Sequence, residues 1–419
     1  MIQKLIAVCF LGIALILLNF SQLQNAAKVH NQYNDCQYIN ITNQEKVLGP
    51  EDSAFYDEDT LISSYGNIYE IFFEKKDLKT VSKGGFVLIQ GIKSGNIKAY
   101  TMEIRNYPQN VFLIPLGIYI RDDMLYAINH SFYSGGGDRV EVFKIVKVLN
   151  QKHNLEKKQQ ENLNQEDGES EQEFMFVLQF VSYTLLPKRF NGITNNLVVV
   201  ENTRFFITDS FPYSLPIKGV NRESFIQTAV TYFYYIFQIK NNHVWDCQII
   251  QEGEAQCHPF ENSKSVLNNG ISTDNDGIFL VADTILKTVR VYKFNETEQV
   301  LDLKQTIHLG ISVDNINYIQ SSNSFLATGT TKMLDTLLLP FNIKKVENNK
   351  ESTPDVKFGS EIFEIKLNPL TKVYEAISIL KSDEVIVGAS GAQMSSNREF
   401  LFVNSFADKS LSICKKASI

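Results

Sequence analysis

Short runs of β-branched and aromatic residues, each bounded by turn residues, make up most of this chain. GGFVLIQG, RVEVFKIVKV and EFLFVNSF are three of them. Runs of this length and composition are typical of β-strands. Few segments show the spacing of apolar residues that is typical of long amphipathic helices. An all-β fold is therefore expected.

Six of these runs end alike, which indicates a weak internal repeat. The similar strand ends, which finish near residues 65, 130, 210, 284, 330 and 406, are LISSY, YAINH, FITDS, LVADT, LATGT and FVNSF. Repetition at irregular intervals of some tens of residues is what β-propeller blades with loops of variable length produce. Six units predict six four-stranded blades. Chance similarity among the strand ends of another all-β fold is the alternative.

Two segments depart from this rhythm of strands. Residues 150–173 are polar, charged and rich in Gln, so they are expected to be a disordered insertion within the propeller. Residues 221–239 are apolar and aromatic, and predict either a helix or a buried strand pair. Core packing is the simpler role for this second segment, and a lid or membrane-contacting element is the alternative.

The N-terminus carries a continuous apolar run from Leu5 to Phe20 after one Lys. This length suits the hydrophobic region of a signal peptide and is short for a spanning helix. Small residues that would mark cleavage are confined to Ala26 and Ala27. Residues 1–27 are therefore expected to be a signal peptide or a retained hydrophobic anchor. The protein would be secreted or extracellular, and a retained leader would bring it to a lipid or membrane surface.

Cysteine usage agrees with export. Cys9 lies in the apolar run, which leaves Cys36, Cys247, Cys257 and Cys414. An even number in an exported chain suggests two disulfides, and three connectivities are open. The placement of Cys36 and Cys414 near the chain ends favours a bridge between them, with the other two closing a local loop. A zinc site that also uses His243 and His258 is the less favoured interpretation.

Sequons mark three Asn side chains for glycosylation if the chain is exported. Asn40 and Asn295 are the favoured acceptors, because Asn129 lies next to strand-like residues.

Composition excludes one broad class of function. The 419 residues carry a net charge of -7, and no cluster of Lys and Arg with interleaved aromatic residues occurs. Nucleic acid is therefore not an expected partner. Serine-hydrolase elbows, zinc-protease helices and Walker loops are also absent from the sequence.

Polar residues with oxygen-bearing side chains stand at the starts of several expected strands. They occur in GPED, ITNNLVVV, LNNGIS and SVDNIN, and include Glu51, Asp52, Asn195, Asn196, Asn268, Asn269, Asp314 and Asn315. Turn chemistry alone explains each motif separately. In a propeller, however, the inner strands converge on one axis, so these side chains would meet around a central tunnel. Carboxylate and amide oxygens together suit calcium.

At this point the chain resembles the paraoxonase/arylesterase family, which are secreted six-bladed propellers with two calcium ions in the central tunnel. The resemblance runs from about Cys36 to Cys414. It is carried in order by GPED, LISS, INHS, VEVFK, NNLVVV, FFITD, NNGIS, VRVYKF, VDNI and SLSIC. It implies a propeller over residues 36–419, with a few helices over the active-site face and the insertion at 150–173 as an addition.

The resemblance also implies two sets of calcium ligands. The catalytic ion would be held by Glu51, Asn195, Asn269, Asp314 and Asn315. The structural ion would take Asp52, the backbone carbonyl of Ile118 and the side chain at position 196. The family has Asp at that position and this chain has Asn196, so weaker binding is expected there. Cys36 and Cys414 match the disulfide that closes the family's propeller.

The catalytic histidines match less completely. A supporting histidine of the family corresponds to His130. The family's general-base histidine falls on Leu116 of PLGI, and leucine does not accept a proton.

Two functions follow from these residues, and a third, weaker interpretation is a related propeller enzyme of the gluconolactonase or strictosidine-synthase type, which the chain resembles only in architecture. The first is calcium-dependent hydrolysis of a small-molecule lactone or aryl ester, in which calcium polarises the carbonyl and stabilises the oxyanion. The alternative, based on Leu116, is a non-catalytic calcium-binding propeller that binds lipid or a partner.

Overall fold

A computed structural model describes residues 31–42, 47–67, 70, 81–131, 136–149, 174–212, 225–251, 253–332, 359–382, 386, 388–408 and 410–417. In these ranges the chain forms 26 strands, three short 3₁₀ turns and the helix α3 (Phe225–Ile236). The expected all-β class is confirmed. The leader at 1–27 and the insertion at 150–173 lie outside the described residues.

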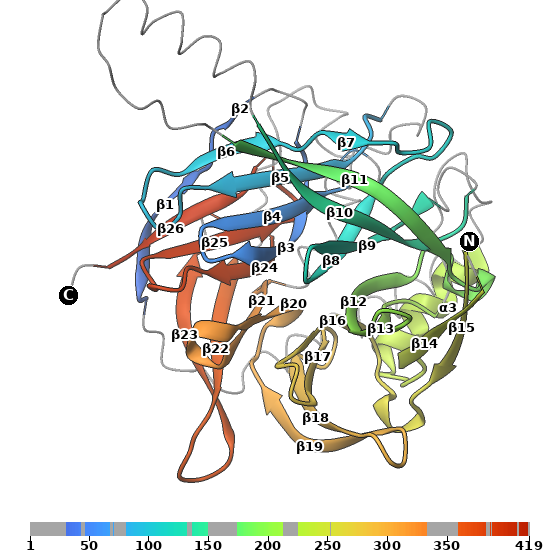
Figure 1. Ribbon diagram of the computed structural model, residues 1–419. Helices are drawn as coiled ribbons and strands as arrows, with labels where there is room; N and C mark the ends of the chain where they lie inside the picture. Colours follow the sequence, from blue (N-terminus) through green and yellow to red (C-terminus); the bar gives the residue numbers. More distant parts are fainter. Residues whose placement is uncertain are drawn as a thin grey trace, which may run out of the picture.

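Four-stranded antiparallel units are the repeating element of the fold (Figure 1). Unit 1 contains β3 (Pro50–Asp57), β4 (Thr60–Tyr65), β5 (Gly85–Gln90) and β6 (Lys98–Thr101). Unit 2 contains β8 (Pro115–Arg121), β9 (Met124–Asn129), β10 (Arg139–Leu149) and β11 (Phe174–Leu185). Unit 3 contains β12 (Thr194–Glu201), β13 (Arg204–Asp209), β14 (Val244–Gln251) and β15 (Glu254–Pro259).

Three further units complete the set. Unit 4 contains β16 (Asn268–Thr273), β17 (Ile278–Asp283), β18 (Thr288–Asn295) and β19 (Val300–His308). Unit 5 contains β20 (Ser312–Ile319), β21 (Ser324–Thr330), β22 (Ser360–Leu367) and β23 (Tyr374–Ser382). Unit 6 contains β24 (Ala389–Met394), β25 (Phe400–Ser405), β26 (Ser412–Lys416) and, from the other end of the chain, β1 (Tyr33–Tyr38).

Two short strands extend these units. The strand β2 (Ile41–Thr42) adds in parallel to β6, and β7 (Ile104–Arg105) adds in parallel to β11. One parallel pair, Leu185 with Glu254, joins β11 to β15, so units 2 and 3 share one nine-stranded sheet.

The first strand of each unit faces the centre of the molecule (Figure 1). Contacts between these strands run β3 to β8, β8 to β12, β12 to β16, β16 to β20, β20 to β24 and β24 back to β3. The six similar strand ends found in the sequence all lie in second strands, namely β4, β9, β13, β17, β21 and β25. The weak repeat therefore marks one structural position in each unit.

The hydrophobic core is divided into layers between neighbouring units. Between units 3 and 4, for example, Phe206 of β13 packs edge-on against Phe260 and Phe294. Equivalent buried clusters lie between each of the remaining five pairs of neighbouring units, including units 6 and 1. Because each sheet has a neighbour on both faces, its strands are apolar on both sides, which explains their continuous rather than alternating apolar runs.

Two disulfides have the pairing that the sequence favours. Cys36 of β1 joins Cys414 of β26 across 378 residues, and Cys247 joins Cys257 across β14 and β15. The first bridge fixes the N-terminal strand onto the C-terminal unit. Because Cys247 and Cys257 are bonded to each other, they do not offer thiolates to zinc.

The apolar segment at 221–239 contains the helix α3, one of the two structures that its sequence allows. Tyr235 packs against Val266 and Leu267, which directly precede β16. The helix therefore lies near the ends at which the innermost strands begin. Phe233 and Phe237 are exposed and stack on each other. No helix among the described residues is long and apolar enough to span a membrane.

The three sequons differ in exposure. Asn129 is fully buried and its amide donates to Glu141 Oε1 at 2.8 Å, so its side chain is inaccessible in the fold. Asn40 is exposed and Asn295 is half-buried.

Candidate metal centre

Polar side chains meet at the centre because of where they lie on the innermost strands. Glu51, Asn195 and Asn269 are each the second residue of β3, β12 and β16, and Asp314 and Asn315 lie early in β20. These five residues are called the outer group below. They come from four different units, and in the assembled fold the Asn315 amide donates to Glu51 while the charge of Asp314 acts on Glu51.

A register shift accompanies the start of every innermost strand. The shifts lie between Pro50 and Ser53, Pro115 and Ile118, Thr194 and Leu197, Asn268 and Ile271, Val313 and Ile316, and Ala389 and Gly391. Such irregularities re-aim side chains, and they are frequent beside functional sites. Gly270 lies within one of them, and a Cβ there would stand 2.5 Å from the Asn315 Cα. Close approach of β16 to β20 therefore requires glycine at this position.

The outer group contains buried oxygens that lack hydrogen-bond partners. They are Glu51 Oε2, Asn195 Oδ1 and Asn269 Oδ1. The Asn269 amide nitrogen donates to Thr284 Oγ1 at 3.2 Å. The Asn315 amide nitrogen donates to Glu51 Oε1 at 3.0 Å and leaves Oε2 unpaired. A buried acceptor without a partner can bind a ligand, so these three oxygens are available to a cation.

The electrostatics of the outer group also favour a cation. Burial raises the pKa of Glu51 well above its ordinary value, and the charges of Asp314 and Asp52 raise it further. Burial likewise raises the pKa of Asp314 to about 7, against the opposing effect of the Asn269 amide. None of these three carboxylates is among the ion pairs that the described residues form with Lys, Arg or His. A bound cation would supply the missing countercharge.

The donor set fits calcium rather than zinc. Two carboxylates and three amides offer hard oxygen ligands, which calcium prefers. In the described part of the chain, no three His, Cys, Asp or Glu side chains are arranged to hold a metal ion by themselves. The carboxylates of Glu51, Asp52 and Asp314 thus affect one another electrostatically without converging on a single point, so amide oxygens are needed to complete any site here.

Asp52, Ile118 and Asn196, called the inner group below, are arranged differently. The Asp52 carboxylate accepts hydrogen bonds from four donors. They are the Ile118 N–H at 3.1 Å, the Ser53 N–H at 2.8 Å, the Asn317 amide at 3.0 Å and the Asn196 amide at 3.3 Å. Burial raises the pKa of Asp52, and these donors oppose that rise. No side-chain oxygen of the inner group is among the buried atoms without a partner.

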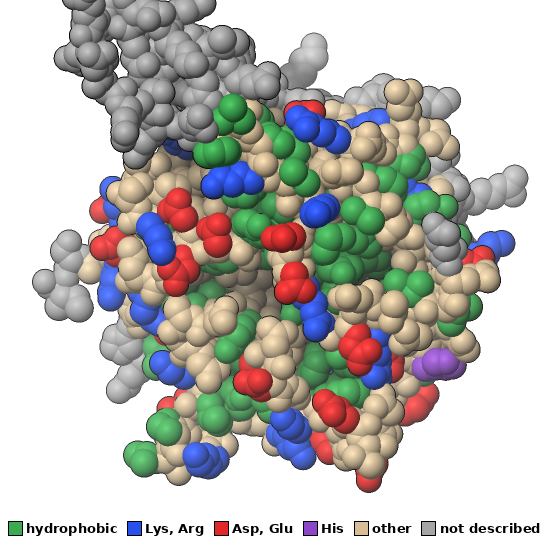
Figure 2. Space-filling model, in the orientation of Figure 1, with side chains coloured by type: hydrophobic (Ala, Val, Ile, Leu, Met, Phe, Trp, Pro, Cys, Tyr) green, Lys and Arg blue, Asp and Glu red, His purple; other side chains and the backbone are tan. Residues whose placement is uncertain are grey.

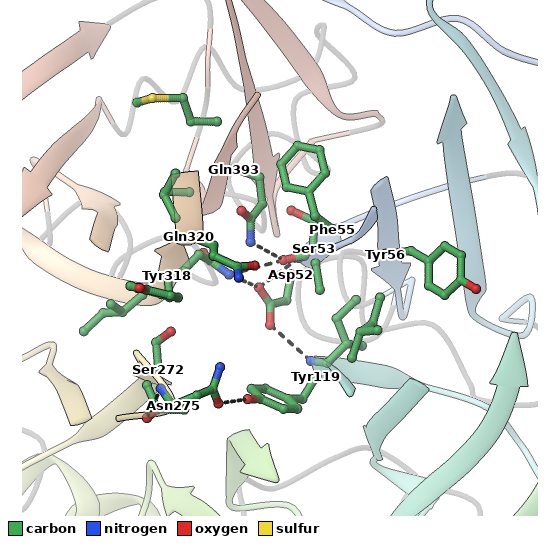
Figure 3. A pocket seen from close by; sticks show the side chains of 18 of the residues that line it. Asp52, Ser53, Phe55, Tyr56, Tyr119, Ser272, Asn275, Tyr318, Gln320 and Gln393 are labelled. Carbon is green, nitrogen blue, oxygen red and sulfur yellow. Dashed lines mark hydrogen bonds between the residues drawn. The ribbon is translucent and has the colours of Figure 1, made fainter. Parts of the chain in front are cut away.

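A cavity of about 530 Å³ opens beyond the inner group, toward the far ends of the innermost strands. Asp52 and Asn196 line this cavity, together with Tyr119, Asn275 and Tyr318. Figure 3 shows Asp52 and the latter three residues around it. The Tyr119 hydroxyl donates to Asn275 Oδ1 at 2.8 Å. None of the outer group lines this cavity. The sequence did not single it out.

Sequence reasoning missed two buried amides at this place. Asn317 and Gln393 both donate to the Ser53 carbonyl, at 3.2 and 2.9 Å, and both line the cavity (Figure 3). Asn317 follows Asn315 by two positions in β20, and this spacing puts both side chains on one face of a strand. This alternation could have identified Asn317 from the sequence. No sequence pattern identified Gln393.

His130 is buried and has a defined partner. Its Nδ1 lies 2.8 Å from Asp138 Oδ2, which also accepts hydrogen bonds from Gly192 N at 2.7 Å and Thr194 Oγ1 at 3.0 Å. Thr194 directly precedes Asn195 of the outer group. The His130–Asp138 pair therefore lies at the end of the strands where the outer group lies.

Leu116 lies at the same end, as the second residue of β8. Its side chain is buried, and its carbonyl accepts a hydrogen bond from Ser64 Oγ at 2.6 Å. The position offers no group that accepts a proton from water.

Charged side chains are mixed over the face shown in Figure 2, where Lys and Arg alternate with Asp and Glu around a hollowed centre. This face carries no continuous basic surface of the kind that nucleic-acid binders present.

No protein-family model matches the chain, and no curated protein matches it. The chain is similar in structure to a gluconolactonase from Xanthomonas campestris, with 11% identity over 94% of this chain and 99% of the other, at a TM-score of 0.42. It is also similar to a luciferin-regenerating enzyme, with 9% identity over 91% and 95% and a TM-score of 0.45. A putative gluconolactonase is also similar in structure. It is 11% identical over 93% of this chain and 97% of the other, with a TM-score of 0.44. With TM-scores this low, the fold description rests on the sheet topology and the strand contacts given above.

Proposed function

We propose that this protein is a calcium-dependent hydrolase of lactones or aryl esters, built as a six-bladed β-propeller. The observation that carries the proposal is the outer group, in which three unpartnered buried oxygens lie with two carboxylates of raised pKa. The contacts between innermost strands, from β3 round to β24 and back, support the propeller.

The outer group would hold the ion through Glu51, Asn195, Asn269, Asp314 and Asn315. When bound there, calcium supplies a Lewis acid that polarises a carbonyl and stabilises negative charge on its oxygen. The chain itself positions these ligands before the ion arrives. Asn315 is anchored by its bond to Glu51, and the Asn269 amide is oriented by Thr284.

His130 is the residue that we propose to accept a proton from the attacking water. Its Nδ1 lies 2.8 Å from Asp138 Oδ2, so the Asp138 carboxylate would stabilise a proton gained by the imidazole. Asp138 is itself held by Gly192 and Thr194, so the orientation of the imidazole is fixed by the fold. Without a second histidine at position 116, proton transfer would depend on this single group, and a slow enzyme is expected.

The alternative function is a calcium-binding propeller without catalysis, which binds lipid or a partner. Two observations favour it. Leu116 offers no base, and Phe233 of α3 and Phe237, which directly follows the helix, are exposed at the same end of the strands as the outer group. In this case the outer group would serve stability alone.

Turnover of a lactone and ester panel separates the two functions. Purified full-length protein is assayed on aliphatic lactones and phenyl acetate, with calcium and with chelator. The hydrolase predicts activity that chelator abolishes. Glu51→Ala is the inactive reference, and Glu58→Ala is the matched control because Glu58 is exposed and pairs only with Lys93 among the described ion pairs. Wild-type activity no higher than that of Glu51→Ala on every substrate would establish the alternative.

Leu116→His tests the missing base directly. If the position lies beside the reacting water, the new imidazole should raise kcat by about 100-fold, within the range of general-base effects. Leu116→Asn is the control, since it adds polarity without a proton acceptor. An equal response of both variants would show that position 116 does not contact the reaction.

We also propose that the chain is exported. Both disulfides are of the kind that persists in oxidising compartments. Mass measurement of protein secreted from a eukaryotic host would show whether residues 1–27 are removed and whether Asn40 and Asn295 carry glycans.

A further inference from the structure

The Asn196 side chain, a member of the inner group, contacts both Asp52 of that group and Asn315 of the outer group. Its amide nitrogen donates to Asp52 Oδ2 at 3.3 Å and to Asn315 Oδ1 at 2.9 Å. Its own Oδ1 accepts the Leu197 N–H at 2.7 Å. All three polar contacts are buried, and they use both ends of the amide.

These contacts fix which way the amide faces. If oxygen and nitrogen exchanged places, the NH₂ group would face the Leu197 N–H and the oxygen would face the Asp52 carboxylate. Both new contacts would be repulsive, so the hydrogen-bond network selects the observed orientation. Asn196 therefore directs its N–H groups, and not its oxygen, toward the place beside Asp52 where the family resemblance puts the structural calcium.

The other members of the inner group do not supply an oxygen ligand in place of the Asn196 oxygen. Ile118 points its N–H at Asp52 Oδ2, and both oxygens of Asp52 already accept hydrogen bonds. Two further buried oxygens without partners, Asn317 Oδ1 and Gln393 Oε1, belong to side chains that line the cavity and are not members of the inner group. The residues present at the inner group thus do not fit a calcium ion, in contrast to those of the outer group.

Charge balance points the same way. Glu51, Asp52 and Asp314 carry three negative charges when ionised. One divalent cation leaves one negative charge, and Asp52 has four donors to stabilise it. A second divalent cation would leave an excess positive charge in a buried place, where an uncompensated charge is costly.

We propose that the chain binds a single calcium ion, at the outer group, and that the Asn196 amide takes the place of a second cation beside Asp52. This inference rests on the proposed function only in placing calcium at the outer group. It differs from the two ions expected from the sequence resemblance, and it assigns to Asn196 a role as a hydrogen-bond donor that replaces a metal ion.

Counting the bound ions tests the proposal. Full-length protein is saturated with calcium, freed of excess by dialysis against calcium-depleted buffer, and analysed for calcium per chain by elemental mass spectrometry. We expect about one ion for the wild type and about two for Asn196→Asp, because a carboxylate at this position removes the donor and restores charge balance. Isothermal titration of metal-free wild-type protein should give the same single site without any variant.

Each other outcome has a definite meaning. Two ions in the wild type would overturn the inference and leave the proposed hydrolase intact. No bound ion would overturn both. One ion together with no turnover on the substrate panel would overturn the hydrolase and leave the inference intact. If Asn196→Asp folds and still binds only one ion, then the Asn196 amide is not what excludes the second ion, and the inference fails.

Discussion

Glu51 and Asp52 are neighbours in β3, but the chain surrounds their carboxylates in opposite ways. Glu51 Oε2 is buried without a partner, and two amide oxygens of the outer group, Asn195 Oδ1 and Asn269 Oδ1, also lack partners. Asp52 accepts four hydrogen bonds from the backbone and from two amides. Adjacent side chains in a strand point to opposite faces, which allows the separation. The difference teaches that the donors around a buried acid, and not its burial alone, decide whether one of its oxygens is left for a cation.

The largest expected effect comes from removing charge at the outer group. Glu51→Gln should lower hydrolytic turnover by about 1,000-fold or more, because both the ion and its stabilisation of the oxyanion are lost. Turnover and bound calcium are measured on the same samples. Glu58→Gln, the matched change in an exposed side chain of the same hairpin, should keep both. Retention of calcium by Glu51→Gln would contradict the ligand assignment.

Removing calcium should lower stability, and more so at higher pH. In metal-free protein the pKa values of Glu51 and Asp314 are raised, mainly by burial, with Asp314 at about 7. The folded state then holds protons that the unfolded state has already lost. Its stability is therefore lost as pH rises from about 4, the ordinary carboxyl range, through 7. With calcium bound, the ion replaces these protons, so the loss should disappear.

Thermal unfolding between pH 5 and pH 8 checks this expectation. The difference in Tm between calcium-loaded and chelated protein should grow with pH and reach roughly 5 to 10 °C. Asp314→Asn should flatten the pH dependence of the chelated protein. A Tm difference that shrinks as pH rises would mean that the carboxylates do not lose protons to the ion.

The smallest effect is expected at the inner group. Asn196→Ala removes one of four donors to Asp52 and should lower the free energy of unfolding by about 1 to 2 kcal/mol, without changing the amount of bound calcium. Denaturant unfolding in calcium measures this. A large loss of calcium from Asn196→Ala would erase the distinction between the two groups.

Much of the fold was predictable from local sequence. Strand-like runs and their recurring ends located the second strand of every unit, since apolar β-branched residues mark strands that are buried on both faces. The two disulfides followed from the number and placement of the cysteines. The sequence did not predict where α3 begins and ends, or that the segment forms a helix and not a strand pair, because a short apolar run is compatible with both structures.

The sequence suggested which residues the candidate site would contain, but it contained no signal for how their side chains are oriented. Turn chemistry explained each polar motif by itself, and the resemblance to a known family singled out Glu51, Asn195 and Asn269 as ligands. Which end of the Asn196 amide faces Asp52 depends on the Leu197 N–H and on Asn315, which comes from another unit. The register shifts in the innermost strands are likewise set by neighbouring strands. Such choices depend on tertiary contacts, which no local pattern contains.

Calcium titration of metal-free protein during turnover is the most direct test of the central claim, that the outer group holds the calcium ion used in hydrolysis. Bound calcium and initial rates on a responsive lactone or ester are measured at each addition. The account predicts that turnover rises in proportion to occupancy and levels off at about one ion per chain. Turnover that is already complete in metal-free protein, or that stays at the level of Glu51→Ala after the site is filled, would contradict it.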